Sequence, residues 1–362
     1  MIIERAARIR KRPIQITLLE CPAHEALYRV TDAPTGLAGF IAIHSTARGP
    51  ATGGLRFRTY DNEDDAIADV LNLSRGMTYK NAAADLPLGG GKAVIIGDPE
   101  TDKSPRKLRA FGDAIQSLRG RYWTAEDMGL TPGDMETLAA TTRYVAGRTA
   151  GPHASGDPSP ATAKGVLQGM RIALRHATGN DRLRGRRVAV QGLGHVGWAL
   201  AGMLYEAGAG LIVADIDADR VARAQSELNA VAVDPGVIHE AKADVFAPCA
   251  IGGTLNARTI PELGARIVAG SANNQLAGRE DANRLMRHGI LFAPDYVINC
   301  GGVINVAAEI LRIRDREQWL EDKLGAMGDF LSDVLSRATR TGLPPANVAD
   351  RIVEETLLPH AA

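Results

Sequence analysis

A short apolar strand followed by closely spaced glycines constrains the fold of this chain more than any other feature. Residues 187–197 read RVAVQGLGHVG, in which Gly192, Gly194 and Gly197 have the spacing GxGxxG. The apolar residues that follow recur at helical spacing, and residues 211–214 form a second apolar run that ends at Asp215. A strand, a helix and a second strand in this order form a βαβ unit, and a glycine-rich first turn is typical of dinucleotide-binding sheets.

The three glycines predict how a dinucleotide would bind. Gly192 permits the tight turn, Gly194 lets backbone N–H groups approach a pyrophosphate, and Gly197 lets the helix pack closely on the strand. The helix N-terminus adds partial positive charge at the same place. Leu193, His195 and Val196 belong to the same motif and are also expected to contact the cofactor.

The residue at the end of the second strand indicates which dinucleotide binds. Asp215 lies 18 residues after Gly197, where a carboxylate accepts hydrogen bonds from the adenosine ribose and repels a 2′-phosphate. NAD is therefore favoured. Arg220 is a cation that a phosphate would contact, so NADP remains the alternative.

The length and rhythm of the chain predict two α/β domains. At about 100–200 residues per domain, 362 residues suffice for two. A Gly/Pro/Ser-rich stretch, residues 147–160, breaks the periodicity, and short apolar runs then alternate with helices as in a doubly wound parallel sheet. We expect strands at residues 188–190, 211–214, 245–247, 267–269 and 290–292.

These patterns define the expected domains. We expect residues 1–147 to form a mixed α/β domain, joined by a C-terminal helix at about 337–362. Residues 148–336 form the Rossmann domain, which binds NAD and faces the first domain across a cleft. Residues 324–335 carry a strong apolar stripe at helical spacing, which must be covered by another element.

The first domain carries an unusual pair of lysines. Residues 40–44 and 93–96 are expected strands, and apolar residues 66–77 predict a helix that ends just before Lys80. Gly89, Gly90 and Gly91 are expected to form a turn before Lys92. Desolvation and a nearby second cation would lower the pKa of Lys92, and a neutral amine at pH 7 is a usable base. The spacing does not match a phosphate-binding P-loop.

Composition excludes several classes of partner and site. With 42 basic and 42 acidic residues and a pI of about 7.1, the chain has no field to hold nucleic acid or an anionic membrane. No apolar run is long enough to span a bilayer. Three scattered cysteines favour a reducing, cytoplasmic compartment, and eight scattered histidines predict no metal site.

Several further motifs, in a consistent order, carry a family resemblance. They are GGLR at 53–56, the two lysines, TAEDMG at 124–129, SGDPSPATAKGV at 155–166, the nucleotide motif, GSANNQLA at 270–277 and NCGGVINV at 299–306. The chain thereby resembles the amino acid dehydrogenase superfamily of glutamate, leucine, valine and phenylalanine dehydrogenases, from about Ala38 through about Glu309.

The resemblance implies a role for each motif residue. Lys80 would bind the substrate α-carboxylate, Lys92 would be the general base, and Asp127 would shuttle protons at the amino nitrogen. Asn273 or Asn274 would position nicotinamide and substrate, with Gly53 and Gly54 beside them. An amino acid, NAD and water would give a 2-oxo acid, ammonia and NADH. The family also implies that Thr162, Ala250 and Asn273 contact the cofactor. It further implies a homo-oligomer, in which the first domain binds substrate and mediates oligomerisation.

The residues at the substrate pocket indicate which amino acid binds. Glutamate dehydrogenases have a lysine and a serine where this chain has Thr52 and Val306, so a second carboxylate would lack partners. Val303 and Val306 favour the branched aliphatic substrates leucine, valine and isoleucine. The hydroxyl of Thr52 leaves aromatic substrates, phenylalanine and tryptophan, as an alternative. An alternative of another class is an NAD-binding regulatory protein without catalysis.

Overall fold

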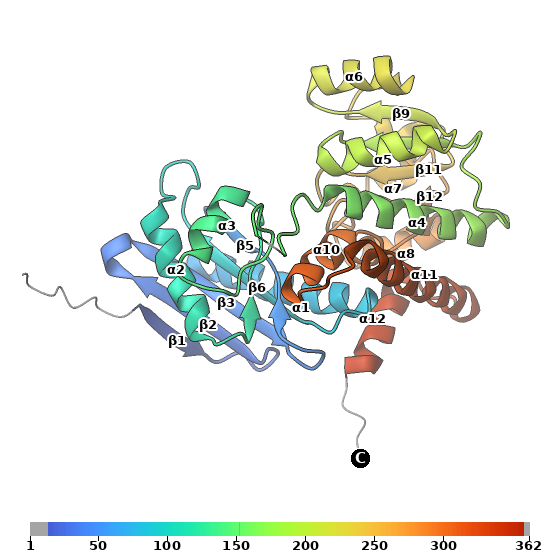
Figure 1. Cartoon of the computed structure of the whole chain (residues 1–362). Helices are drawn as coiled ribbons and strands as arrows, with labels where there is room; N and C mark the ends of the chain where they lie inside the picture. The colour runs from blue at the N-terminus through green and yellow to red at the C-terminus, as the bar shows by residue number, and fades with distance from the viewer. Residues whose placement is uncertain (1–13, 152, 358–362) are drawn as a thin grey trace, which may run out of the picture.

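The chain folds into two lobes, each built on its own β-sheet (Figure 1). The computed structural model describes residues 14–151 and 153–357, so the predicted first domain begins, and its C-terminal segment ends, outside these ranges. Among the described residues, no helix is both long and apolar enough to cross a membrane.

The first sheet is mixed and has seven strands. Its order is β1-β2-β3-β6-β4-β7, with β5 also paired to β6. Strands β1, β2, β3 and β6 pair antiparallel, whereas β4 and β5 run parallel to β6. The strands are β1 (Gln15–Leu19), β2 (Ala26–Asp32), β3 (Leu37–Ser45), β4 (Ala51–Thr52), β5 (Leu55–Arg58), β6 (Gly89–Ile96) and β7 (Tyr122–Trp123).

Helices cover both faces of this sheet, because alternate strand residues point to opposite sides. Phe40 and Ala42 of β3 belong to the core under α1 (Glu63–Ala83), and Ile41 and Ile43 belong to the core under α2 (Pro105–Ser117) and α3 (Pro132–Ala139). These three helices and the seven strands make up the first lobe.

Two sequence expectations near the lysines are wrong. Helix α1 does not end before Lys80 but runs to Ala83, because alanines continue the helix and Ala83 is buried in the core. Gly89, Gly90 and Gly91 do not form a turn but begin strand β6. A Cβ on Gly90 would lie 2.0 Å from Thr78 Oγ1 of α1, so Gly90 lets the helix pack directly on the strand.

The second sheet is parallel throughout, in the order β10-β9-β8-β11-β12-β13. This is the strand order 3-2-1-4-5-6 of dinucleotide-binding folds, which confirms the predicted two-domain α/β class. The strands are β8 (Arg187–Gln191), β9 (Gly210–Ala214), β10 (Val231–Ala232), β11 (Val245–Pro248), β12 (Ile267–Val268) and β13 (Leu291–Phe292). Only β10 was missed, since two residues show no periodicity.

The helices of the second lobe enclose this sheet and extend beyond it (Figure 1). Val188 and Val190 of β8 face the core shared with α4 and α5, whereas Ala189 faces the opposite core. The helices are α4 (Ser159–Thr178), α5 (His195–Glu206), α6 (Ala218–Leu228), α7 (Thr259–Glu262), α8 (Glu280–Arg287), α9 (Asp295–Ile298), α10 (Gly301–Ile310), α11 (Arg316–Thr341) and α12 (Pro345–Leu357).

The C-terminal helices bring the end of the chain back to the first lobe. The apolar stripe of α11 packs on α4 and α10, and α12 contacts α1. Glu354 of α12 accepts hydrogen bonds from Arg75 Nη2 at 3.2 Å and from Tyr79 Oη at 2.6 Å. Because Tyr79 precedes Lys80, this contact fixes the end of α1 that carries the lysine.

The close packing of α1 on β6 gives a testable expectation. The Gly90→Ala variant places a methyl group against Thr78 and should lower the free energy of unfolding by about 1–3 kcal/mol. The matched control is Gly325→Ala on the exposed side of α11, where no atom would contact the Cβ and better helix propensity should stabilise by roughly 1 kcal/mol. Melting temperatures of the two variants should therefore move in opposite directions; a decrease shared by both would contradict this account.

Candidate active site

A lysine and an aspartate from distant parts of the first lobe form a buried ion pair. Lys92 lies in β6 and is 4% exposed, and its Nζ donates a hydrogen bond to Oδ2 of Asp127 in the loop after β7. A Cβ on Gly53 would lie 1.8 Å from Gly91 O, and one on Gly54 would lie 2.9 Å from Asp127 Cβ. The two glycines are thus required for this close approach.

The neighbouring cations keep Asp127 ionised. Burial would raise the pKa of this carboxyl, but the charges of Lys92 and Arg56, together with hydrogen bonds from Lys92 and the Met128 N–H, lower it to about 2. Asp127 is therefore a carboxylate at neutral pH. The residue pattern around Lys92 predicted only a second cation near it. The contact with Asp127 was not predicted, because Lys92 and Asp127 are 35 positions apart in the chain.

Lys80 joins the two lobes beside this pair. It lies in the last turn of α1, and its Nζ donates to Asn273 Oδ1 at 3.1 Å. Asn299 Nδ2 donates to the same oxygen at 2.9 Å. Burial lowers the pKa of Lys80; the charge of Asp295 opposes this shift, whereas that of Lys92 adds to it.

The structure distinguishes the two neighbouring asparagines. Asn273 directs its side chain toward Lys80, as described above. Asn274 has a left-handed backbone (φ 52°), a conformation that asparagine tolerates, and its carbonyl accepts a hydrogen bond from Gly253 N at 2.8 Å. The geometry therefore favours Asn273 over Asn274 as the side chain that faces a ligand.

The residues predicted to line the substrate pocket lie on β4 and α10. Thr52 is 1% exposed, and its hydroxyl donates to Pro50 O at 3.3 Å, so this polar group already has a partner. Val303 and Val306 are half-buried and one helical turn apart on α10. Trp123, which pairs with Thr52 across β4 and β7, packs on the same core as both valines. The sequence analysis did not select Trp123.

The glycine loop has the shape that a pyrophosphate requires. Gly192 has φ 94°, and a Cβ there would lie 2.8 Å from Ala250 Cβ; a Cβ on Gly197 would lie 2.0 Å from Gly192 O. By contrast, a Cβ on Gly194 would meet no other part of the protein within 4 Å. Gly194 is the N-cap of α5 and supplies no side-chain hydrogen bond, so the first N–H groups of this helix can bind an anion.

The other predicted cofactor residues surround this loop. Asp215 directly follows β9 and is 7% exposed at its side chain; Oδ2 accepts from Leu193 N at 2.5 Å, and Oδ1 accepts from Asp217 N at 2.9 Å. Arg220 Nε contacts Asp217 at 3.1 Å. His195 is exposed at the start of α5 and Val196 is half-buried beside it. Thr162 lies in the first turn of α4, where its hydroxyl donates to Pro158 O at 3.0 Å.

Two exposed isoleucines next to these residues were missed by the sequence analysis. Ile216 follows Asp215 and is 97% exposed, and Ile251 follows Ala250 and is 75% exposed. Both come after the carboxyl ends of strands that flank β8, where dinucleotides bind in open α/β sheets. Their signal in the sequence was an apolar residue directly after the end of a strand.

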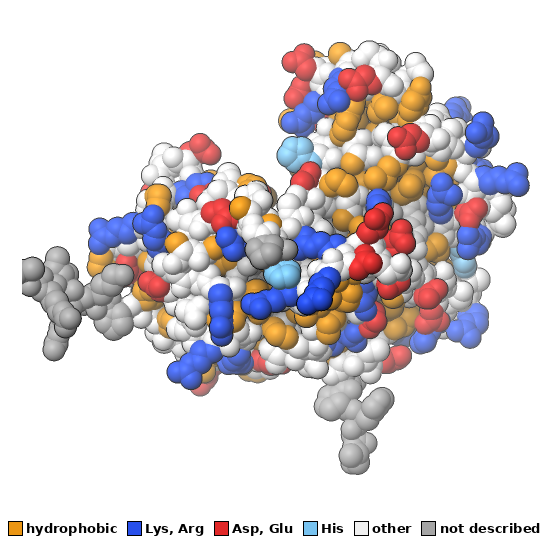
Figure 2. All heavy atoms as spheres, viewed as in Figure 1, with side chains coloured by type: hydrophobic (Ala, Val, Ile, Leu, Met, Phe, Trp, Pro, Cys, Tyr) orange, Lys and Arg blue, Asp and Glu red, His pale blue; other side chains and the backbone are white. Residues whose placement is uncertain are grey.

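The buried carboxylate of Glu309 binds the segment that connects the two lobes. Glu309 of α10 is 8% exposed, and its Oε2 accepts from Gly147 N at 2.9 Å, Ser155 N at 2.9 Å and Ser155 Oγ at 2.6 Å. A cavity of about 460 Å³, whose lining includes Trp123, Arg148 and Glu309, lies beside this segment. The notch between the lobes is visible in the space-filling view (Figure 2).

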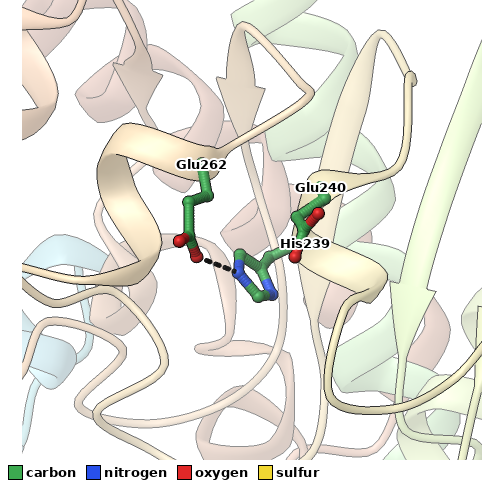
Figure 3. A group of neighbouring side chains, drawn as sticks. All are labelled: His239, Glu240 and Glu262. Carbon is green, nitrogen blue, oxygen red and sulfur yellow. Dashed lines mark hydrogen bonds and ion pairs between the residues drawn. The ribbon is translucent and has the colours of Figure 1, made fainter.

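A separate group of potential metal ligands lies away from these residues. His239, Glu240 and Glu262 place one ligand atom each within 4.8 Å of one another, and within the described part of the chain no other such group was found (Figure 3). His239 Nε2 is 3.1 Å from Glu262 Oε2, and both carboxylates are exposed. An ordinary His–Glu contact accounts for this arrangement.

Comparison with known proteins assigns the family. The model of the Glu/Leu/Phe/Val dehydrogenase dimerisation domain matches residues 24–144, and the model of Glutamate/Leucine/Phenylalanine/Valine dehydrogenase matches residues 212–340. Leucine dehydrogenase of Geobacillus stearothermophilus is 49% identical over 339 residues, which cover 94% of this chain and 92% of that protein. The chain belongs to the Glu/Leu/Phe/Val dehydrogenase family.

Other members of this family are also similar over nearly their whole length. Valine dehydrogenase of Streptomyces virginiae is 47% identical over 337 residues, covering 92% of this chain and 94% of that protein. The crystal structure of L-tryptophan dehydrogenase from Nostoc punctiforme has a TM-score of 0.81 and 40% identity, covering 92% of this chain and 96% of that one. The family resemblance drawn from the sequence motifs is therefore confirmed.

The contacts of Glu309 give a testable expectation about the connecting segment. In the Glu309→Ala variant, the N–H groups of Gly147 and Ser155 lose their acceptor, which should cost about 1–3 kcal/mol of unfolding free energy. The matched control is Glu321→Ala on the exposed face of α11, where the change should stay within about 0.5 kcal/mol. Melting temperature and the rate of proteolytic cleavage at residues 147–155 measure the difference, and equal values for both variants would contradict it.

Proposed function

We propose that this chain catalyses the reversible oxidative deamination of an L-amino acid with NAD. The amino acid, NAD and water give a 2-oxo acid, ammonia and NADH. The observation that carries this proposal is the convergence of Lys80, Lys92 and Asp127, from three separate segments, beside Asn273 of the other lobe. An amino acid requires a cation for its carboxylate and a proton donor and acceptor at its nitrogen.

Each of these residues would have a distinct task. Lys80 would bind the α-carboxylate, with Asn273 orienting its ammonium group. Lys92 would act as general base toward the water that adds to the substrate carbon. Asp127 would exchange a proton with the amino nitrogen, and the hydrogen bond between the two groups lets a proton pass from one to the other. Closure of the lobes would exclude bulk water from the pair.

The glycine loop and Asp215 fit a dinucleotide. The open space at Gly194 and the uncapped start of α5 suit a pyrophosphate. Bound NAD would supply the hydride acceptor. Asp215 carries negative charge where a 2′-phosphate would lie, which supports NAD over NADP. Ile216 and Ile251 offer apolar surface for the adenine.

Branched aliphatic amino acids are the proposed substrates. The relatives named leucine and valine dehydrogenase support this choice, as do Val303 and Val306, which offer apolar surface without a partner for a second carboxylate. The similarity to a tryptophan dehydrogenase favours an aromatic substrate as the second candidate.

The domain division and the assembly are part of the same proposal. Residues 1–147, with the C-terminal segment from about 337, would form the substrate-binding domain, and residues 148–336 the NAD-binding domain. The family model that matches residues 24–144 is described as a dimerisation domain, which supports a homo-oligomer. A cytoplasmic location remains a prediction.

Replacement of the proposed base tests the mechanism. The Lys92→Ala variant should lose about 100- to 10,000-fold in kcat, because general base catalysis contributes this much. Lys103→Ala is the matched control: Lys103 is also a partly buried lysine paired with a carboxylate of the first lobe, Asp134 at 2.9 Å, but lies outside the proposed site. NADH absorbance measures both rates. Near-normal turnover in Lys92→Ala would exclude the proposed role, and absence of turnover in the unaltered protein would favour the regulatory alternative.

A substrate panel tests the specificity. Leucine, valine, phenylalanine and tryptophan should be ranked by kcat/KM with NAD and with NADP. We expect leucine and valine to lead, with overlapping activities, because one methylene in an apolar pocket changes kcat/KM only about 10- to 200-fold. We expect NAD to be used in preference to NADP. A higher kcat/KM for tryptophan or phenylalanine would establish the aromatic alternative.

A further inference from the structure

Arg56 lies between two carboxylates next to the Lys92–Asp127 pair. It belongs to β5, opposite Val94 of β6, and its side chain is 16% exposed. Its Nε donates to Asp127 Oδ1 at 3.1 Å. Its Nη1 donates to both carboxylate oxygens of Asp69 on α1, at 3.2 and 3.0 Å, and Tyr60 Oη donates to Asp69 at 2.7 Å. The guanidinium group is therefore held from both sides.

The bonds to Asp127 divide its two oxygens between different partners. Oδ1 accepts from Arg56 Nε and from Met128 N, the latter at 2.6 Å, whereas Oδ2 faces Lys92. Two donors on one oxygen oppose rotation of the carboxylate. Oδ2 is thus kept in the direction of the amine, where the proposed proton exchange takes place.

We propose that Arg56 is a positioning residue for catalysis, which fixes the orientation of Asp127 and supplies part of the positive charge that its carboxylate requires. This inference rests on the proposed function. Arg56 is not a catalytic residue. Its side chain donates its hydrogen bonds to Asp127 and Asp69 inside the first lobe and not toward the space between the lobes. In the sequence, Arg56 was recognised only as the last residue of the GGLR motif.

The charges around the pair determine the sign of the effect. Asp127 faces Lys92 of β6 and Arg56 of β5, and it interacts over a longer range with Lys80 of α1 and Tyr122 of β7. Glu126 lies beside it in the chain, and Asp69 of α1 also binds Arg56. Burial would lower the pKa of Arg56, but Asp127 and Asp69 raise it, so the cation persists at every working pH.

Removal of this cation should change both rate and pH dependence. Arg56 is one of the two cations whose charges lower the pKa of Asp127, so without it the carboxylate would bind a proton more readily. In Arg56→Gln, the pH at which kcat/KM falls on the acidic side of the profile should increase by about one pH unit. Loss of orientation should also reduce kcat roughly 10- to 100-fold.

Two further variants separate charge from geometry. Arg56→Lys keeps the charge but cannot contact both carboxylates in the same way, so kcat should fall while the acidic limb stays near its original pH. Asp69→Asn removes the competing carboxylate and keeps Arg56, so the limb should move to lower pH. This second variant also tests the inference if Arg56→Gln does not fold.

The matched control is Arg48→Gln. Arg48 is likewise a first-lobe arginine that binds a carboxylate, Asp85 at 2.7 Å, and a backbone carbonyl, Leu86 O at 3.0 Å, but it makes no contact with Asp127. If Arg56 is only a structural ion pair, both glutamine variants will lower the melting temperature and leave the pH profile unchanged, and the inference is overturned. An inactive unaltered protein would instead contradict the proposed function itself.

Discussion

The buried contact between Lys92 and Asp127 is the interaction on which the arrangement of the first lobe depends. An ammonium and a carboxylate removed from water are costly unless they are paired and hydrogen bonded. Glycines allow the main chain to pack closely around the pair. Gly53 and Gly54 let the segment between β4 and β5 approach it, and Gly90 lets α1 lie directly on β6. Arg56 supplies the second cation that a carboxylate in this position requires.

The site is completed only where the two lobes meet. Lys80 comes from α1 of the first lobe, and the oxygen that it contacts belongs to Asn273 of the second. Glu309 fastens the connecting segment to α10, and Glu354 joins α12 to the end of α1. These contacts hold elements near the junction in place, so the relative position of the lobes controls how close the amines lie to the glycine loop.

Errors in the sequence analysis came from the same close packing. A run of three glycines before a lysine was interpreted as a turn, since glycine is common in turns. In the fold these glycines begin strand β6, and no space is left there for a Cβ, because Ser45 lies against Gly89, Thr78 of α1 against Gly90 and Tyr122 against Gly91. The end of α1 was placed too early for a related reason: Ala82 and Ala83 continue the helix and Ala83 is buried in the core, which the periodicity of large apolar residues does not reveal.

The sequence by itself determined the parallel nucleotide-binding sheet, the glycine loop with Asp215, and the two lysines, since each depends on local periodicity or on a motif of consecutive residues. Tertiary structure alone decided that Asp127 pairs with Lys92, that Arg56 lies behind Asp127, and that Asn273 rather than Asn274 faces Lys80. These contacts join segments far apart in the chain, and their directions follow from strand register and from the packing of α1 on the sheet, which no local pattern encodes.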